Sequence, residues 1–428
     1  MRFFTLFAAL IAILWTTSAL AGPAIIPSER VVRWANIRVA PDSSTETIAR
    51  LKPGELVDLV EAIPAWYRVR LADGREGYIS RAWTEEVNNE AAFQPQYFVH
   101  MIDVGTGLAV FVEGPGFTLL YDAGSNDDLS RGSNNRVIAY LRKVRPALAK
   151  IDHVILSHPH RDHVELMPDV LATYEVSNVW DPGRTNPICA YRAMLELVQA
   201  RSIAYHDAEG TGHDHIAAFK PQTCYGQQWP EKTLTIPHAS RIVRDQPIAL
   251  GGGATLRFLH ATAEKEPSFN ENSLVASLDL GRSRLLLMGD GEAGGRRLPT
   301  ILPASSSVEG QLLACCAKNL NADVLVVGHH GSKTSSRTAT LDKIQAYIFL
   351  VSAGPTRYAT VTLPDQEIIG ELATRGTVYR TDANDAACRT DTAKVGTDAD
   401  NRAGGCENVL VEIDPSGAIR ARAYRLVD

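Results

Sequence analysis

Short stretches of alternating apolar and polar residues occupy the chain between positions 29 and 88. Turn clusters such as Ala40-Pro41-Asp42-Ser43 and Ala72-Asp73-Gly74 separate these stretches. A period of two predicts strands that bury one face, and several short strands in so few residues predict a small all-β barrel. The expected strands cover residues 31–32, 35–39, 55–61, 66–71 and 77–79.

From position 97 to the end, apolar strands alternate with helical patterns. Val137, Ile138, Leu141 and Val144 recur at helical spacing between two such strands. Repeated strand–helix–strand order predicts a second, α/β domain over 97–428, and the polar residues 89–96 are expected to link the two. The expected strands cover residues 97–103, 109–113, 117–121, 151–157, 285–288, 324–328, 347–352, 409–413 and 418–424.

The first 21 residues have the pattern of a signal peptide. Arg2 precedes an apolar stretch, and Ala19-Leu20-Ala21 offers a small-x-small cleavage site. The apolar stretch is short for a membrane span, although an uncleaved anchor is the alternative, and no later segment approaches the required length. A periplasmic or secreted protein without a membrane span after signal cleavage is therefore expected.

Composition limits the classes of partner. The net charge of −6 over 428 residues lacks the basic excess of a general nucleic-acid binder, so nucleic acid is expected only as a substrate. Six cysteines without C-x-x-C spacing suit an oxidising compartment. We expect Cys388 to pair with Cys406, and Cys189 with Cys224, whereas Cys315 and Cys316 read as buried thiols in an apolar helix.

Three strand ends carry the candidate chemistry. Ser157-His158-Pro159-His160-Arg161-Asp162-His163 follows an apolar strand directly, and it concentrates imidazole and carboxylate ligands of the kind that zinc and related divalent metals prefer. Two later apolar strands run into Gly289-Asp290 and Gly328-His329-His330-Gly331-Ser332. Each delivers a metal-capable side chain to the same kind of edge, which favours one shared metal site over separate turns.

These motifs resemble the metallo-β-lactamase superfamily, and more closely the hydrolase domain of ComEC-type competence proteins. His100-Met101-Ile102-Asp103-Val104-Gly105-x-Gly107, Leu120-Tyr121-Asp122-Ala123-Gly124 and Asn272-Ser273-Leu274-Val275 belong to the same ordered set, which spans roughly residues 97–427. The resemblance implies an αββα sandwich with a two-metal site at one edge, preceded here by the small barrel.

Carried over residue by residue, the resemblance assigns two divalent ions, zinc first and manganese as the alternative. His158 and His160 would hold the first metal; Asp162, His163 and His330 would hold the second; Asp290 would bridge both, and Asp162 and Asp290 would be catalytic. His330 is preferred to His329, which remains a further candidate ligand, because related members place the ligand two residues before a serine. Asp103 and Asp122 would orient the ligands or cap turns, and Ser332 and Lys333 would bind an anionic substrate, with a solvated surface role for Lys333 as the alternative.

The chain departs from the family pattern in places. Phe269 and Asn270 stand where family members with a complete first metal site carry a histidine. The nearest histidines upstream of this position are His260 and His238. An amide oxygen from Asn270 would favour manganese or magnesium somewhat more. Thr106-Gly107-Leu108 replaces a usual Gln-Gly-Asp, which indicates a different substrate-facing loop. His213-Asp214-His215 could bind another ion, although a solvated loop is favoured.

The N-terminal barrel resembles a bacterial SH3-like domain. The matching segments are Asn36-Ile37-Arg38, Leu51-Lys52-Pro53-Gly54-Glu55, Trp66-Tyr67-Arg68-Val69-Arg70 and Gly77-Tyr78-Ile79. The resemblance implies a module that binds cell-wall peptide or serves as an accessory domain. Trp66, Tyr67 and Tyr78 would form its groove or pack inside the barrel.

The function expected from these features is that of an exported metallohydrolase whose two metals activate water, with phosphodiesters as the favoured substrates. Small-molecule and polymer substrates both remain open. An ester, lactone or amide hydrolase of the envelope is one alternative, and a cell-wall-binding protein with a degenerate metal site is the other.

Overall fold

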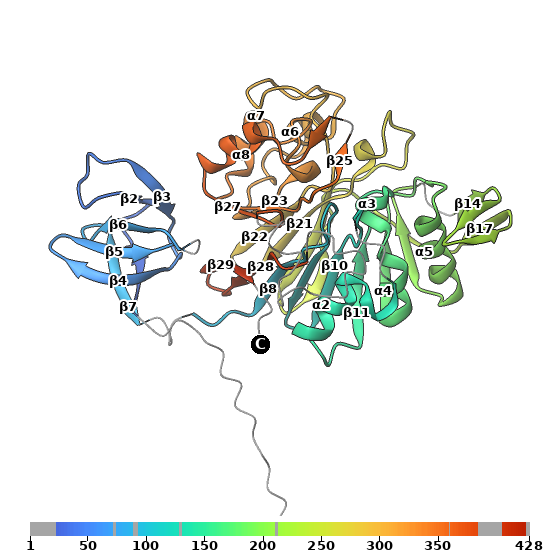
Figure 1. Cartoon of the computed structure of the whole chain (residues 1–428), viewed down its shortest axis with the longest axis horizontal. Coiled ribbons are helices and arrows are strands. Elements are labelled where there is room, and N and C mark those ends of the chain that lie inside the picture. The colour runs from blue at the N-terminus through green and yellow to red at the C-terminus, as the bar shows by residue number, and fades with distance from the viewer. Residues whose placement is uncertain are drawn as a thin grey trace, which may run out of the picture.

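The computed structural model describes residues 23–71, 74–88, 93–127, 131–209, 213–358, 360–383 and 405–424. The expected signal peptide, residues 89–92 of the expected linker and Cys388 lie outside these ranges. Figure 1 shows a small β-domain from the N-terminal part of the chain beside a larger domain with helices on its outside. Among the described residues, no helix is long and apolar enough to cross a bilayer.

The small domain is one strongly curved sheet in the order β3-β2-β6-β5-β4-β1-β7. Its strand β1 lies before the expected range of 29–88. Pro23 and Pro27 at its ends resemble chain breaks in sequence because proline donates no backbone N–H, yet Ala24 and Ile25 between them pair with β4 and β7. The strands are β1 (Pro23–Pro27), β2 (Ala35–Arg38), β3 (Thr47–Leu51), β4 (Val57–Ile63), β5 (Trp66–Arg70), β6 (Glu76–Ser80) and β7 (Thr84–Asn88).

The barrel core shows which of the three aromatic residues considered above pack inside the barrel. Tyr67 is buried with Ile37, Val69 and Ile79, so it packs inside the barrel. Trp66 and Tyr78 are half-buried. Each precedes a buried residue, Tyr67 or Ile79, and successive residues on a strand point to opposite faces of the sheet.

The larger domain contains two sheets. The first has the order β18-β13-β12-β11-β10-β9-β8-β28-β29, and its strands from β10 to β18 are parallel. These strands are β8 (Tyr97–Met101), β9 (Val110–Gly114), β10 (Phe117–Tyr121), β11 (Lys150–Ile155), β12 (Glu175–Trp180), β13 (Ala204–Asp207), β18 (His238–Arg241), β28 (Asn408–Ile413) and β29 (Ile419–Tyr424).

The second sheet has the order β19-β20-β21-β22-β23-β24-β27 and is parallel from β22 onward. The strands are β19 (Ile248–Gly251), β20 (Ala254–His260), β21 (Val275–Leu280), β22 (Ser283–Leu287), β23 (Val324–Val326), β24 (Ile348–Val351) and β27 (Thr377–Arg380).

The two sheets pack face to face, and helices cover both outer faces (Figure 1). Val112 and Leu119 from the first sheet share a core with Leu278 and Leu287 from the second. The expected αββα sandwich behind an all-β barrel is confirmed. The helices are α2 (Arg136–Val144), α3 (Arg161–Val164), α4 (Met167–Thr173), α5 (Cys189–Ala200), α6 (Val308–Cys315), α7 (Thr338–Ile344) and α8 (Gln366–Ala373), with short 3-10 turns η1 (Gly132–Asn134), η2 (Asn270–Asn272) and η3 (Gly328–Gly331).

Three two-stranded sheets lie outside this frame: β14 (His215–Phe219) with β17 (Lys232–Ile236), β15 (Gln222–Cys224) with β16 (Gln227–Trp229), and β25 (Arg357–Tyr358) with β26 (Val361–Thr362). The expected Cys189–Cys224 disulfide is confirmed, and it ties the start of α5 to β15. Cys315 and Cys316 were expected to be free buried thiols, which is wrong. They form a disulfide with each other, and Cys315 is exposed because α6 ends there. Cys406 is disulfide-bonded.

A turn of the barrel contacts the larger domain. Lys52 Nζ donates to the Gln345 carbonyl at 2.9 Å and lies 3.9 Å from the Tyr347 ring centroid. Glu55, in the same turn, is buried. Tyr347 directly precedes β24, so the barrel sits at the N-terminal ends of the parallel strands.

Candidate metal centre

Four loops at one edge of the sandwich bring the strand-end motifs together. Two of them follow β10 and β11 of the first sheet, and two follow β22 and β23 of the second. They carry Asp122, the segment 157–163, Asp290 and the turn η3. Because the carboxyl ends of parallel strands meet at a common edge, residues far apart in sequence become neighbours here.

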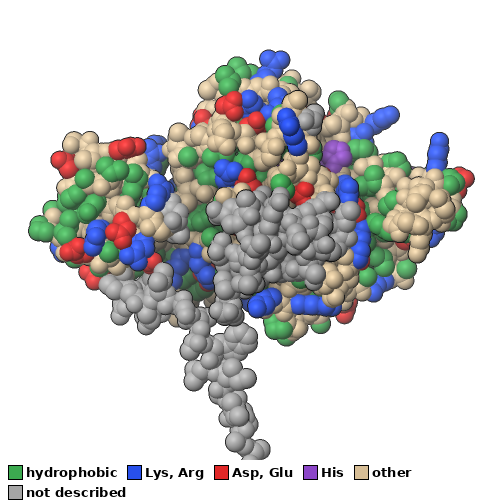
Figure 2. Space-filling view, viewed as in Figure 1, with side chains coloured by type: hydrophobic (Ala, Val, Ile, Leu, Met, Phe, Trp, Pro, Cys, Tyr) green, Lys and Arg blue, Asp and Glu red, His purple; other side chains and the backbone are tan. Residues whose placement is uncertain are grey.

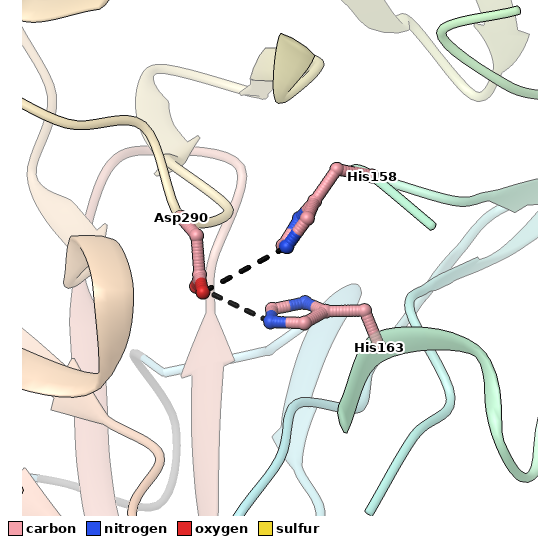
Figure 3. Close-up of side chains that lie close together, drawn as sticks. All are labelled: His158, His163 and Asp290. Atoms are coloured by element: carbon pink, nitrogen blue, oxygen red, sulfur yellow. Dashed lines mark ion pairs between the residues drawn. The ribbon is translucent and has the colours of Figure 1, made fainter. Parts of the chain in front are cut away.

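Asp290 lies at the centre of the cluster and faces histidines on both sides. Its Oδ1 lies 3.2 Å from His163 Nε2 and 3.6 Å from His330 Nε2. Its Oδ2 lies 3.8 Å from His158 Nε2 and 3.6 Å from His329 Nε2. Figure 3 shows the carboxylate directed at His158 and His163, which come from the loop after β11 and from α3. The Asp290 carboxylate therefore lies between His163 and His330 on one side and His158 and His329 on the other.

Two overlapping groups within the cluster have the spacing of metal ligands. One consists of His158, His163 and Asp290, and the other of Asp162, His163 and His330; in each, the ligand atoms lie within 4.8 Å of one another. Asp162 Oδ2 is 3.8 Å from His330 Nε2. All five side chains are buried.

The chemistry of these buried atoms fits a divalent cation. His163 Nε2, His330 Nε2 and Asp290 Oδ1 have no hydrogen-bond partner among the described residues. A buried polar atom without a partner costs free energy, and a cation on these atoms would remove that cost. The donor set of imidazole nitrogen and carboxylate oxygen suits zinc or manganese.

Polar contacts fix the orientation of two of these histidines. Asp122, held at φ +58, accepts from His163 Nδ1 at 2.8 Å and from the Ser157 backbone N–H and hydroxyl, each at 2.6 Å. His330 Nδ1 donates to the Ser352 carbonyl at 2.9 Å. Both contacts leave the Nε2 atoms of His163 and His330 directed at Asp290. Asp122 therefore acts on the cluster by orienting His163, and orienting a ligand was one of the two roles expected for it.

Electrostatics separate the roles of the histidines and the central carboxylate. Burial lowers the pKa of His158 well below its ordinary value, and the neighbouring His163 adds to the effect, so the His158 ring is neutral and able to ligate. Burial would also lower the pKa of His163, but Asp290 and Asp122 raise it well above the usual range. Burial would raise the pKa of Asp290, yet His163, His329 and His330 hold it well below its ordinary value. Asp290 is therefore a permanent anion.

The first-metal side is more open. His160, which immediately precedes α3, lies next to His158, with its Nδ1 2.9 Å from His158 Nε2. Asn270 lies on the same side: its Nδ2 donates to Glu292 Oε1 at 2.8 Å, and its buried Oδ1 has no partner among the described residues. His329 Nε2 is 3.5 Å from the Asn270 amide, so His329 also lines this side.

The turn that carries His329 and His330 has an unusual backbone. Both residues have positive φ, +50 and +53, a conformation that costs of order 1–3 kcal/mol for non-glycine residues and is typical of functional sites. Gly124, after β10, allows the backbone of His163 to lie very close to it, because a Cβ at position 124 would lie 2.2 Å from the His163 backbone nitrogen.

Three expected site residues make other contacts. Asp103 accepts four backbone N–H groups, from Gly105 and from residues 405–407, which is its turn-capping alternative. Lys333 pairs with Glu367 at 2.7 Å, and the buried Ser332 hydroxyl is hydrogen-bonded to Thr334 and Arg296.

The nearest upstream histidines also have other partners. His260 Nδ1 donates to the Ser273 carbonyl at 2.7 Å, and His238 lies beside Asp207. In the loop that departs from the family pattern, the Thr106 hydroxyl accepts from the Thr356 backbone N–H at 2.9 Å.

Two residues of the site carry no signal in the sequence. The Tyr358 hydroxyl donates to Asp162 Oδ2 at 2.7 Å, and Asn126 donates to the same oxygen at 3.1 Å. Tyr358 lies on the short strand β25, 196 residues from Asp162. Burial and Asp162 raise the pKa of Tyr358 above its ordinary value, so the hydroxyl remains a proton donor.

Comparisons with known proteins agree with this geometry. The family model described as the metallo-beta-lactamase superfamily matches residues 102–349, more than half of the chain. The model described as the bacterial SH3 domain matches residues 34–85.

The curated relatives are distant. Recombination protein 2 of Haemophilus influenzae is 24% identical over 262 residues, which cover 61% of this chain and 25% of that protein. Uncharacterized protein YcaI of Escherichia coli is 25% identical over 276 residues, which cover 64% of this chain and 27% of that protein. The chain thus spans about a quarter of the length of these relatives. Among solved structures, the metallo-beta-lactamase fold protein YhfI from Bacillus subtilis is 14% identical, with a TM-score of 0.35 over 68% of this chain and 98% of that one.

Proposed function

Because the chain belongs to the metallo-β-lactamase superfamily, we propose that it is an exported, metal-dependent hydrolase that cleaves phosphodiester bonds. The observation that carries the proposal is the convergence of His163 Nε2, His330 Nε2 and Asp290 Oδ1 as buried atoms without hydrogen-bond partners among the described residues. Packing alone would not retain such atoms, whereas a hydrolytic metal site requires them.

Two divalent ions fit the cluster. His158, His160 and Asp290, with the Asn270 amide oxygen, would hold the first; Asp162, His163, Asp290 and His330 would hold the second. Such ions, when bound, lower the pKa of water and polarise a substrate oxygen. Asp162 and Asp290 would orient the attacking water. The Tyr358 hydroxyl, which donates its one proton to Asp162 at 2.7 Å, would turn that hydrogen bond to a substrate oxygen once Asp162 holds a metal ion.

Charge beside the cluster supports an anionic substrate. A pocket of about 690 Å³ adjoins the metal loop, and it is lined by Arg131, Arg161 and Tyr225, among others. Both arginines pair with the one carboxylate of Glu165, which leaves a surplus positive charge. Arg161 stands between His160 and Asp162 in the chain, so the segment that carries these candidate ligands also supplies a wall of the pocket. On the face shown in Figure 2, acidic and basic side chains are interspersed, so the wider surface adds no further excess of positive charge.

Metal content and turnover of the purified protein test the proposal together. We expect divalent metal on the protein and hydrolysis of bis-p-nitrophenyl phosphate with added zinc or manganese, faster than that of a p-nitrophenyl ester. The His160→Ala/Asp162→Ala double variant should keep its circular dichroism spectrum and lose turnover. Arg161→Ala should raise KM for the phosphodiester more than for the neutral ester, whereas Arg282→Ala, an exposed arginine elsewhere, should not.

Ester turnover without phosphodiester turnover would favour the envelope esterase alternative instead. Retained activity in the double variant would refute the metal mechanism.

The bacterial SH3 domain supports a second element of the proposal, which is attachment to cell-wall peptide. Co-sedimentation of the full chain with purified peptidoglycan tests it, with the Trp66→Ala/Tyr78→Ala variant expected to remain in the supernatant. Equal sedimentation of the variant would contradict a role for these two side chains. Cleavage of the signal peptide would be contradicted if the protein recovered from cells still began with Met1.

A further inference from the structure

A second group of metal-capable side chains lies outside the cluster described above. Asp207 ends β13, Glu209 follows it, and His215 begins β14. His215 Nδ1 lies 3.7 Å from Asp207 Oδ2 and 3.6 Å from Glu209 Oε1, and the three ligand atoms lie within 4.8 Å of one another.

These distances suit a shared cation better than direct hydrogen bonds. A hydrogen bond between an imidazole nitrogen and a carboxylate oxygen spans about 2.7–3.2 Å. Ligand atoms around a tetrahedral zinc, with bonds of about 2.0–2.1 Å, are separated by about 3.3–3.4 Å, so small adjustments would bring all three onto one ion.

Unpartnered buried atoms point into the same place. Both ring nitrogens of His215 and Oδ2 of Asp207 have no hydrogen-bond partner among the described residues, although His215 is only 1% exposed and Asp207 is fully buried. Asp181, at the end of the neighbouring strand β12, is also fully buried, and its Oδ2 lacks a partner in the same part of the chain.

We propose that Asp207, Glu209 and His215 form an additional divalent-metal site, distinct from the cluster around Asp290, that takes a zinc-class ion. His238 Nε2 lies 2.9 Å from Asp207 Oδ1, so a second histidine adjoins this carboxylate. Glu209 is half exposed and gives the ion access to solvent.

The site is separate from the cluster around Asp290 and its role is structural. Asp207 is the last residue of β13, which lies two strands from β11, so the two sites are about 10 Å apart along the edge. The ion would tie the end of β13 to the two-stranded sheet of β14 and β17. In the segment His213-Asp214-His215, His213 and Asp214 are exposed, as expected for a solvated loop. Only His215 of these three residues is buried.

Metal stoichiometry of the intact chain decides the proposal. After saturation with zinc and gel filtration, elemental analysis should find one equivalent fewer in His215→Ala than in the wild type, and no change in His213→Ala, the matched exposed control. Because a buried histidine could be needed for folding, Glu209→Gln provides a milder variant, for which zinc titration should show one class of site weakened by roughly tenfold or more.

Hydrolysis by Glu209→Gln should equal that of the wild type, which separates this site from the catalytic one. Equal zinc content in the wild type and His215→Ala, or unchanged zinc affinity in Glu209→Gln, would overturn the proposal and leave a water-filled polar cavity.

Discussion

Glu55, in the turn that joins the barrel to the larger domain, makes the stability of that contact depend on pH. Burial raises the pKa of Glu55 to about 8 from its ordinary 4.5, although the Lys52 backbone N–H and ammonium oppose the shift. Asp323, on the facing domain, raises it further. The folded protein therefore holds a proton on Glu55 at pH values where the unfolded chain has released it.

The sign and size of the effect follow from proton linkage. For an acid with a raised pKa, the contribution to stability is complete below pH 4.5 and is lost as the pH rises toward 8. Each pH unit in that window removes about 1.4 kcal/mol, so the free energy of unfolding should fall by about 3 kcal/mol between pH 5.5 and 9 because of this residue alone.

Glu55→Gln removes the titration while keeping a side-chain oxygen that can accept from Lys52. Urea unfolding can be followed by the fluorescence of Trp34, Trp66 and Trp83, which all lie in the barrel sequence. The wild type should lose about 3 kcal/mol more than the variant between the two pH values. Glu86→Gln, an exposed glutamate on β7, should behave as the wild type does. The same pH dependence in the wild type and Glu55→Gln would refute the linkage.

Three further predictions concern the metal centre. Asp122→Asn should weaken zinc or manganese binding by roughly 10- to 100-fold in a metal titration, because His163 loses the anion that orients it. Gly124→Ala should lower the melting temperature and the metal content together, since its Cβ would lie 2.2 Å from the His163 backbone. Tyr358→Phe should lower kcat by roughly a hundredfold with metal content unchanged, and unaltered kcat would exclude Tyr358 from catalysis.

Most of the fold could be predicted from the amino-acid sequence because several strands end in distinctive motifs. The apolar strand before Ser157 and the glycines beside Asp290 and His330 place ligands at strand ends, and the order of these motifs is specific to one sandwich. Strand β1 escaped prediction because Pro23 and Pro27 suggest a break, whereas only the residues between them need to donate hydrogen bonds.

Parts of the site had no local signal at all. Tyr358 reaches Asp162 from a two-residue strand, and its contact depends on how the β25–β26 hairpin lies over the edge. Asp103 stands in a motif beside the site, yet its carboxylate binds backbone amides near residue 405. His215 looked like part of a solvated loop because its neighbours His213 and Asp214 are polar, and only the fold brings Asp207 to it.

The barrel and the metal centre occupy opposite ends of the same parallel strands, and this limits what the barrel can do. Asp290 and His330 follow the carboxyl ends of β22 and β23, while Asp323 precedes β23 and lines a cleft of about 580 Å³ shared with Trp34 of the barrel. With about 3.3 Å per strand residue, the two ends lie roughly 15 Å apart through the sheet. No barrel side chain lining that cleft can touch a small substrate at Asp290. The barrel can therefore change where the hydrolase is held, and substitutions at Trp34 should alter attachment while leaving kcat on a small phosphodiester as it is in the wild type.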